Sequence, residues 1–262
     1  MQLLNNLRKY GKPPFHVAVI HGGPGAAGEM THVARDLSRG REVLEPLQTA
    51  KSIEGQVAEL KDVLEKHASP PVTLIGFSWG AWLSFIFAAE HPELTKKLIL
   101  VSSGPFEQKY ADKIMQTRLS RLSDSEKLKV TSLMNSFDNS QVEDKNTFFA
   151  EFGKLFSKAD SFDPIEVSGE EIDVRFDIYQ SIWKQAEQLR KSGDLLEYGR
   201  KIKCSVTAIH GDFDPHPAEG VKLPLSSCIK DFRFILLPNC GHKPWLEKQA
   251  KELFYNIIEK EL

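Results

Sequence analysis

The sequence predicts an α/β fold with a mostly parallel central sheet, flanking helices and an inserted block of helices. In the first hundred or so residues, short runs rich in β-branched residues alternate with helical patterns, which is typical of a parallel sheet covered by helices. From about residue 105 to residue 200 helical periodicity takes over, and strand-like runs return after that. We therefore assign residues 1–104 and 201–262 to an α/β core and residues 105–200 to a helical cap, or lid.

Six short and mostly apolar runs are expected to form the strands of the core. Glycine, proline or polar residues bound them, as expected of buried strands. In chain order they cover residues 15–20, 42–47, 71–75, 97–101, 205–209 and 232–236. The chain begins close to the first of these runs, so no antiparallel strand is expected before it.

Local signals mark where several helices begin and end. Ser52 precedes a run with helical spacing and is expected to be its N-cap. Ser123 and Glu126 match the capping-box pattern at the start of a helix in the insertion. Gly193 suits a helix C-terminus, and Pro244 suits the first turn of the closing helix.

Composition excludes several classes of partner and setting. The 262-residue chain has a formal net charge of −2, so there is no electrostatic reason to expect nucleic acid or an anionic membrane. No apolar run approaches the roughly 18 residues needed to span a bilayer, and the first residues do not resemble a signal peptide. The widely spaced Cys204, Cys228 and Cys240 indicate neither a disulfide framework nor a metal or redox motif. We expect a reduced, cytoplasmic setting, and the oligomeric state stays open.

The strongest chemical signal is the pentapeptide from Gly76 to Gly80, which matches G-x-S-x-G with Ser78 at its centre. A strand is expected before it and a helix after it, which is the context that this motif needs. The glycines allow a tight turn in which a Cβ at either flank would collide with neighbouring backbone. The turn presents the serine hydroxyl at the positive end of the following helix, where developing negative charge is favoured. The sequence therefore predicts Ser78 as a nucleophile.

A serine hydroxyl needs a base, and the base needs an acid partner. His242 follows the last expected strand, so it should lie at the sheet edge that carries Ser78. Asp214 and Asp212 both follow the preceding strand, and we favour Asp214 because it lies further out on its loop. The resulting chain order of Ser, Asp and His is that of an α/β-hydrolase triad. His216 is expected to be a loop residue rather than the base.

An oxyanion hole is expected at the end of the first strand. The glycine-rich run His21–Gly25 can direct backbone N–H groups at a tetrahedral oxygen, and we assign this role to the N–H groups of Gly23 and Trp79. A phosphate-binding turn is the other interpretation of such a run. It is disfavoured because the run matches neither G-x-G-x-x-G nor the P-loop pattern.

With these elements placed, the sequence resembles the α/β-hydrolase superfamily over roughly residues 15–104 and 200–262. His21–Gly25 and Ser78-Trp79-Gly80 resemble the proline iminopeptidase branch. The resemblance implies oxyanion N–H groups at Gly23 and Trp79, as assigned above. This sequence departs from that branch at Phe77, because those enzymes usually have a second glycine directly before the serine. It also departs in that no antiparallel strands are expected before the first buried strand.

The helical insertion is expected to determine substrate specificity. In prolyl enzymes, carboxylates of the lid are expected to hold the free amino group of the substrate, although a solvated acidic face is the simpler interpretation here. Phe152 and Trp82 are candidates for lining the substrate pocket, although phenylalanines at helical spacing more often form internal packing. Seven acidic residues fall in the relevant stretch: Asp160, Asp163, Glu166, Glu170, Glu171, Asp173 and Asp177.

The leading functional hypothesis is a serine hydrolase without a cofactor that cleaves an ester or amide bond of a small-molecule substrate through an acyl-enzyme on Ser78. A proline iminopeptidase-like aminopeptidase is the first alternative. The second is a ligand-binding protein that keeps the fold without turnover, which the joint presence of Ser78, Asp214 and His242 disfavours. No metal is expected, because no cluster of His, Asp and Glu has ligand spacing along the chain.

Overall fold

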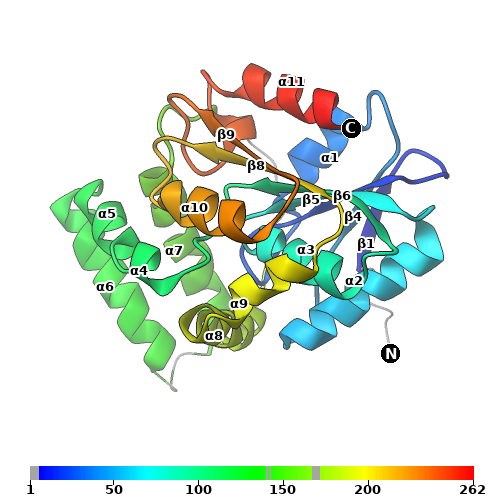
Figure 1. The fold of residues 1–262 in the computed structure, drawn as a ribbon. Coiled ribbons are helices and arrows are strands. Elements are labelled where there is room, and N and C mark those ends of the chain that lie inside the picture. The colour runs from blue at the N-terminus through cyan, green and yellow to red at the C-terminus, as the bar shows by residue number, and fades with distance from the viewer. Residues whose placement is uncertain (1–5, 140, 142, 167–171) are drawn as a thin grey trace.

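The structure, a computed structural model, describes residues 6–139, 141, 143–166 and 172–262 (Figure 1). Its centre is a seven-stranded sheet in the order β1-β4-β2-β5-β6-β8-β9, in which β1 pairs antiparallel with β4 and the other neighbours pair parallel. The mostly parallel sheet predicted from the sequence is confirmed. Its strands are β1 Leu7–Tyr10, β2 Val17–Ile20, β4 Val43–Pro46, β5 Val72–Phe77, β6 Thr95–Val101, β8 Ser205–Gly211 and β9 Phe232–Leu237.

The expectation of six strands with no antiparallel strand at the start is wrong. β1 opens the sheet and pairs with β4, with Leu7 opposite Pro46 and Tyr10 opposite Val43. Leu7 is buried, whereas Lys9 is exposed. A short edge strand with charged side chains has no long apolar run, so apolar content could not reveal it, and those charges discourage pairing with another chain.

Helices cover both faces of the sheet. α1 Thr31–Leu37 and α11 Lys251–Glu261 pack on one face, and α2 Ile53–His67, α3 Trp79–Glu90 and α10 Glu219–Cys228 pack on the other (Figure 1). Alternation along β2 separates the two layers, because Val17 and Val19 face α1 and α11 while Ala18 and Ile20 face α2 and α3. Every residue of α3 before Glu90 is buried, so this helix is fixed from all sides.

The predicted helix signals are confirmed at three places. The Ser52 hydroxyl accepts a hydrogen bond from the Gly55 N–H and caps α2. Ser123 and Glu126 form the expected capping box. Gly193 ends a long helix in the left-handed conformation, with φ of 87°. Pro244 instead begins a short 3₁₀ turn, η2 Pro244–Leu246, and α11 starts only at Lys251.

The segment between β6 and β8 is mainly helical and stands to one side of the sheet (Figure 1). A small apolar cluster holds its helices together, with Leu122, Val130, Leu133, Phe152 and Ala159 buried. Its elements are α4 Gln108–Ala111, α5 Ile114–Ser120, α6 Asp124–Asp138, α7 Lys145–Asp160, β7 Asp173–Val174, α8 Phe176–Ser192, α9 Asp194–Glu197 and the 3₁₀ helix η1 Tyr198–Lys201.

The inserted segment contacts loops at the carboxyl edge of the sheet. The short strand β3 Ala26–Ala27 pairs antiparallel with β7. The Arg175 N–H donates to the Gly25 carbonyl over 2.7 Å, and the His242 N–H donates to the Asp160 carbonyl over 2.8 Å. The insertion is therefore hydrogen-bonded to the loop of the predicted base and to the glycine-rich turn.

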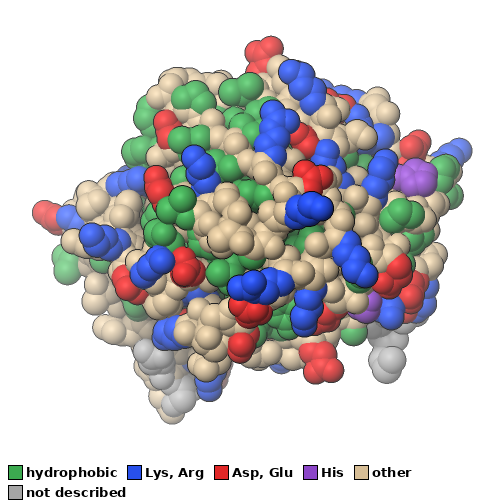
Figure 2. Space-filling view, viewed as in Figure 1, with side chains coloured by type: hydrophobic (Ala, Val, Ile, Leu, Met, Phe, Trp, Pro, Cys, Tyr) green, Lys and Arg blue, Asp and Glu red, His purple; other side chains and the backbone are tan. Residues whose placement is uncertain are grey.

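The surface carries charges of both signs. Figure 2 shows basic and acidic side chains interspersed over the face that carries α9, α10 and α2, in keeping with the small net charge. None of the described helices combines the length and apolar character needed to cross a bilayer.

Candidate active site

Ser78 lies in a strained turn between β5 and α3. Its backbone φ and ψ angles are 51° and −112°, a conformation that residues other than glycine rarely adopt. The flanking glycines make the turn possible, because a Cβ at Gly76 would lie 2.3 Å from the Gly80 carbonyl oxygen. At Gly80 a Cβ would lie 2.3 Å from the carbonyl oxygen of Ile20. The turn therefore packs backbone to backbone against the end of β2.

Replacing Gly80 by Ala is expected to destabilise the protein strongly. All three close contacts of the new Cβ are backbone atoms of Ile20 and His21, so no side chain can move to make room. We expect a loss of at least about 2 kcal/mol in the free energy of unfolding, which urea denaturation would measure. Gly153→Ala is the matched control, since a Cβ there meets nothing within 4 Å. Equal stability of the two variants would contradict this account of the turn.

The structure brings Ser78, His242 and Asp214 into one hydrogen-bonded chain. His242 Nε2 lies 3.1 Å from Ser78 Oγ, and His242 Nδ1 lies 2.7 Å from Asp214 Oδ2. A carboxylate only accepts, so Nδ1 carries the proton and Nε2 presents its lone pair to the serine. Asp212 lies elsewhere, with its Oδ1 accepting the Cys240 N–H over 3.1 Å. The arrangement places Asp214, and not Asp212, against the imidazole.

The Phe77 ring packs against the imidazole of His242. This ring is 1% exposed and lies 4.8 Å from the His242 ring and 4.7 Å from the Trp245 ring, measured between centroids. Phe77, in the second position of the pentapeptide, therefore contacts the His242 imidazole. A glycine at this position would make no such contact.

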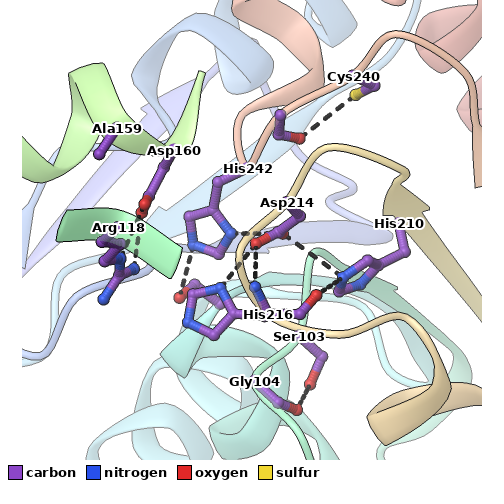
Figure 3. A network of polar contacts seen from close by, with 12 residues as sticks. Ser103, Gly104, Arg118, Ala159, Asp160, His210, Asp214, His216, Cys240 and His242 are labelled. Carbon is purple, nitrogen blue, oxygen red and sulfur yellow. Dashed lines mark hydrogen bonds and ion pairs between the residues drawn. The ribbon is translucent and has the colours of Figure 1, made fainter. Parts of the chain in front are cut away.

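His216 is a neighbour of Asp214 and His242 whose position the sequence did not predict. Its Nδ1 donates to Asp214 Oδ1 over 2.7 Å, and its backbone N–H donates to the same oxygen over 2.9 Å. Its ring lies beside that of His242, with centroids 4.6 Å apart (Figure 3). The Asp214 carboxylate thus lies between two imidazoles. The pattern Asp-Pro-His is a short Asx-type turn signal, but it does not reveal where the ring points.

The pKa of Asp214 lies well below its ordinary value. Burial by itself would raise it, but attraction by His242, His216 and His210 outweighs burial. His210 reaches this carboxylate from β8, with its Nε2 3.6 Å from Oδ2 and 2.8 Å from the carbonyl oxygen of His216. Asp214 is therefore a buried, fully ionised acceptor for the surrounding N–H groups.

Two buried imidazoles make stability depend on pH. Burial lowers the pKa of His21 and of His216 to about 4, against about 6.5 in an unfolded chain. Between pH 6.5 and 4 the unfolded chain binds protons that the folded chain does not, so the free energy of unfolding falls as the pH falls. We expect up to about 3 kcal/mol from each group, measured by urea denaturation at stepped pH. The slope should flatten in His216→Asn, and an unchanged slope would contradict its assignment to His216.

The predicted oxyanion donors lie on the two segments that meet at the turn. In the paired strands Ile20 stands opposite Gly76, which brings the glycine-rich run beside Ser78. A Cβ at Gly22 would lie 2.6 Å from the Phe77 ring, so this run packs against the turn. Trp79 begins α3, and its indole N–H donates to Gln56 Oε1 over 2.9 Å. The assignment of the oxyanion hole to the backbone N–H groups of Gly23 and Trp79 remains a prediction.

The insertion contributes an ion pair beside the imidazoles. Arg118 Nε and Nη2 donate to the two carboxylate oxygens of Asp160 over 2.8 and 2.6 Å (Figure 3). The Arg118 guanidinium also lies over the Phe156 ring. On the core side, Lys243 Nζ lies 2.8 Å from Glu29 Oε1. Each pair joins one basic and one acidic side chain, so neither adds net charge near His242.

The acidic residues of the insertion are mostly paired or exposed. Asp160 is bound by Arg118, Asp163 lies 2.7 Å from Lys248 Nζ, and Asp177 contacts Lys51 and Arg175. Glu166 and Asp173 are exposed, and Glu170 and Glu171 lie outside the described residues. The described carboxylates that have partners are thus already neutralised by basic side chains.

The two predicted pocket residues belong to packed interiors instead. Phe152 is 7% exposed and packs against Phe137 and Phe156 inside the insertion. Trp82 is 2% exposed, and its indole N–H donates to the Gly104 carbonyl over 3.0 Å while its ring stacks on Trp183. These contacts give no support to the assignment of the two side chains to a substrate pocket, and regular apolar spacing such as that around Phe152 is explained by packing against neighbouring helices.

One group of potential metal ligands appears only in three dimensions. Asp214, His216 and His242 are all buried, and each offers a ligand atom within 4.8 Å of the others. The sequence prediction of no metal cluster rested on spacing along the chain, and His242 is far from the other two in sequence. Folding brings the two loops together at the sheet edge.

Comparison with known proteins places the fold. Residues 48–249 match the family model described as alpha/beta hydrolase fold, and a search of curated proteins found no match. The solved structure of VinJ is similar, with 17% identity and a TM-score of 0.66 over 97% of this chain and 93% of that one. A serine hydrolase involved in carbazole degradation, CarC, has 19% identity and a TM-score of 0.60 over 97% and 92%. A bromoperoxidase from Bacillus anthracis has 15% identity and a TM-score of 0.63 over 97% and 94%. Identities this low establish the fold alone.

Proposed function

Because this chain belongs to the alpha/beta hydrolase fold family, we propose that it is a serine hydrolase that cleaves an ester or amide bond of a small-molecule substrate. The observation that carries the proposal is the chain of hydrogen bonds from Ser78 Oγ through His242 to the buried Asp214. Its separations of 3.1 and 2.7 Å are within the range that proton transfer and orientation require.

In the first half of the reaction, Ser78 Oγ attacks the carbonyl carbon and His242 Nε2 takes the hydroxyl proton. Asp214 stabilises the imidazolium that forms and keeps its proton on Nδ1. The carbonyl oxygen becomes an oxyanion, for which we propose the N–H groups of Gly23 and Trp79 as donors. His242 then protonates the leaving group, and an acyl-enzyme remains on Ser78.

In the second half, water replaces the leaving group. His242 Nε2 removes a proton from the water, which attacks the acyl carbonyl through the same kind of tetrahedral intermediate. Collapse of this intermediate releases the acid and returns the proton to Ser78. Every proton step uses His242, and this chemistry needs no cofactor.

Covalent labelling tests the proposal directly. A fluorophosphonate probe needs an activated serine and an oxyanion hole but makes few demands on substrate shape. We expect one adduct by intact mass on the wild-type protein and none on Ser78→Ala. If the folded wild-type protein takes up no probe, the nucleophile assignment fails, and a non-catalytic, ligand-binding role becomes the better explanation.

The paired carboxylates of the insertion do not favour a preference for N-terminal proline. Asp160, Asp163 and Asp177 have basic partners, so none of them is a ready receiver for a substrate ammonium group. We expect short acyl esters to be hydrolysed at least about tenfold faster, in kcat/KM, than prolyl anilides, as a spectrophotometric assay would show. Faster hydrolysis of the prolyl anilides would favour an aminopeptidase.

A cytoplasmic location also stays a proposal. It is supported by the three cysteines, which are unpaired.

A further inference from the structure

His216 donates twice to one oxygen of the Asp214 carboxylate. Oδ1 accepts the ring N–H of His216 over 2.7 Å and its backbone N–H over 2.9 Å, while Oδ2 accepts the Nδ1–H of His242 over 2.7 Å. Any residue except proline at position 216 would supply the backbone donor. The ring donor is specific to histidine, and the proposed reaction gives it no role.

The His216 ring acts on Asp214 as a neutral donor. Burial lowers the pKa of His216 to about 4, so near neutral pH the ring holds a single proton. A carboxylate only accepts hydrogen bonds, so this proton is on Nδ1. The ring therefore stabilises the charge of Asp214 without adding a positive charge beside the imidazolium that His242 becomes during the proposed reaction.

The central sheet fixes the backbone of residue 216. His210 Nε2 lies 2.8 Å from the carbonyl oxygen of His216 and donates its N–H to it, because a carbonyl only accepts. His210 is 1% exposed and belongs to β8, which is paired with β6 on one side and β9 on the other. Figure 3 shows His210, His216 and His242 grouped around Asp214. The donor on Oδ1 is thus anchored to a rigid strand rather than to a free loop.

The two imidazoles together fix the plane of the Asp214 carboxylate. Each ring binds a different oxygen over 2.7 Å, and all three side chains are buried. A rotation of the carboxylate that moved Oδ2 away from His242 would also break the hydrogen bond from the His216 ring to Oδ1. The alignment of Asp214 with His242 is therefore coupled to the ring of His216.

We propose that His216 is a positioning residue for the hydrolase reaction: its ring N–H holds Oδ1 of Asp214 so that Oδ2 stays aligned with His242 Nδ1. This alignment keeps the His242 tautomer that can accept the proton of Ser78. The effect on rate rests on the proposed function, because only an active serine has a rate to lose. The effect on the hydrogen bond between His242 and Asp214 exists without turnover and can be measured separately.

The test compares His216→Leu with His216→Asn in fluorophosphonate labelling of Ser78. Asparagine can donate an N–H to Asp214 Oδ1 from about the place of the histidine Nδ1, whereas leucine fills space but has no donor. We expect the maximal labelling rate to fall at least about tenfold in His216→Leu and to stay within about threefold of the wild type in His216→Asn. The probe concentration that gives half the maximal rate should change little in either variant.

The order of the two variants separates positioning from packing. If the ring only filled space, the larger and apolar leucine would be the better substitute, so a His216→Leu protein that labels as fast as His216→Asn would overturn the proposal. His67→Leu, at the exposed end of α2, is the control and should label at the wild-type rate. No labelling of folded wild-type protein would count against the proposed function, and spectroscopy would then decide the role of His216.

The spectroscopic measurement uses Ser78→Ala labelled with ¹⁵N-histidine, which needs no activity. Two imidazole N–H protons should resonate at unusually low field, because His216 and His242 each donate to a carboxylate over 2.7 Å. Adding His216→Asn should remove one signal and leave that of His242 in place, whereas adding His216→Leu should also move the His242 signal to higher field. A His242 signal that His216→Leu leaves unchanged would overturn the proposal. If that variant does not fold, a single low-field proton in Ser78→Ala would overturn it as well.

Discussion

Asp214→Asn should lower the rate of ester hydrolysis or of Ser78 labelling by about three to four orders of magnitude. The Asp214 carboxylate accepts N–H groups on both oxygens, from His216 on Oδ1 and from His242 on Oδ2. An asparagine has a single oxygen, so one of the two imidazoles would face an NH₂ group. His242 would then lose either its position or the tautomer that leaves Nε2 free for the serine.

Asp212→Asn is the matched control for this variant. Its carboxylate accepts the Cys240 N–H over 3.1 Å and does not contact His242. The asparagine oxygen can keep that bond, so the rate should fall less than about tenfold. Rates should be compared at equal folded concentration, checked by circular dichroism. A larger loss in Asp212→Asn than in Asp214→Asn would move the acid role to Asp212.

Glu247→Ala should weaken stability and activity together. Glu247 is 1% exposed and accepts three backbone N–H groups, from Phe162 and Gly241 on Oε1 and from Asp163 on Oε2. Alanine would leave the buried Gly241 N–H and the part-buried N–H groups of Phe162 and Asp163 without this partner, so we expect a loss of at least about 2 kcal/mol in the free energy of unfolding. Gly241 precedes the predicted base, so hydrolysis should also fall by at least about tenfold.

Thermal and urea denaturation would measure the first effect of Glu247→Ala, and the labelling rate at low temperature, where the variant is folded, would measure the second. Glu252→Ala, at an exposed position of α11, is the control and should change neither quantity appreciably. A Glu247→Ala protein that unfolds like the wild type would show that water replaces the carboxylate at no cost.

The sequence predicted the core of this structure because its signals are local. The turn at Ser78 needs glycines at two fixed positions, and the buried strands are apolar on both faces. Ser78, Asp214 and His242 could be chosen because each follows a strand whose carboxyl end meets the same edge of the sheet. The edge strand β1 was missed because charged residues interrupt its apolar pattern.

The surroundings of the site depend on contacts between distant loops, which single-residue patterns do not encode. Nothing in the sequence around Glu247 distinguishes it from a surface glutamate, yet it binds the backbone of a segment 85 positions earlier. His216 likewise resembles any loop histidine until its ring is placed on Asp214. Phe152 was assigned to a pocket from its residue type and Trp82 from its closeness to the turn at Ser78, and only the structure shows that both are packed in interiors.

The hydrogen bond from the His242 backbone to Asp160 also bears on how this protein can be recombined with its relatives. Residues 160–163 lie within the insertion by sequence, but through Asp160, Phe162 and Asp163 they are bound to the loop of His242 and to Glu247. A chimera that exchanges the whole insertion would carry these partners away. A workable graft would exchange the helices on either side of this segment and leave residues 160–163 with the recipient, as part of its core.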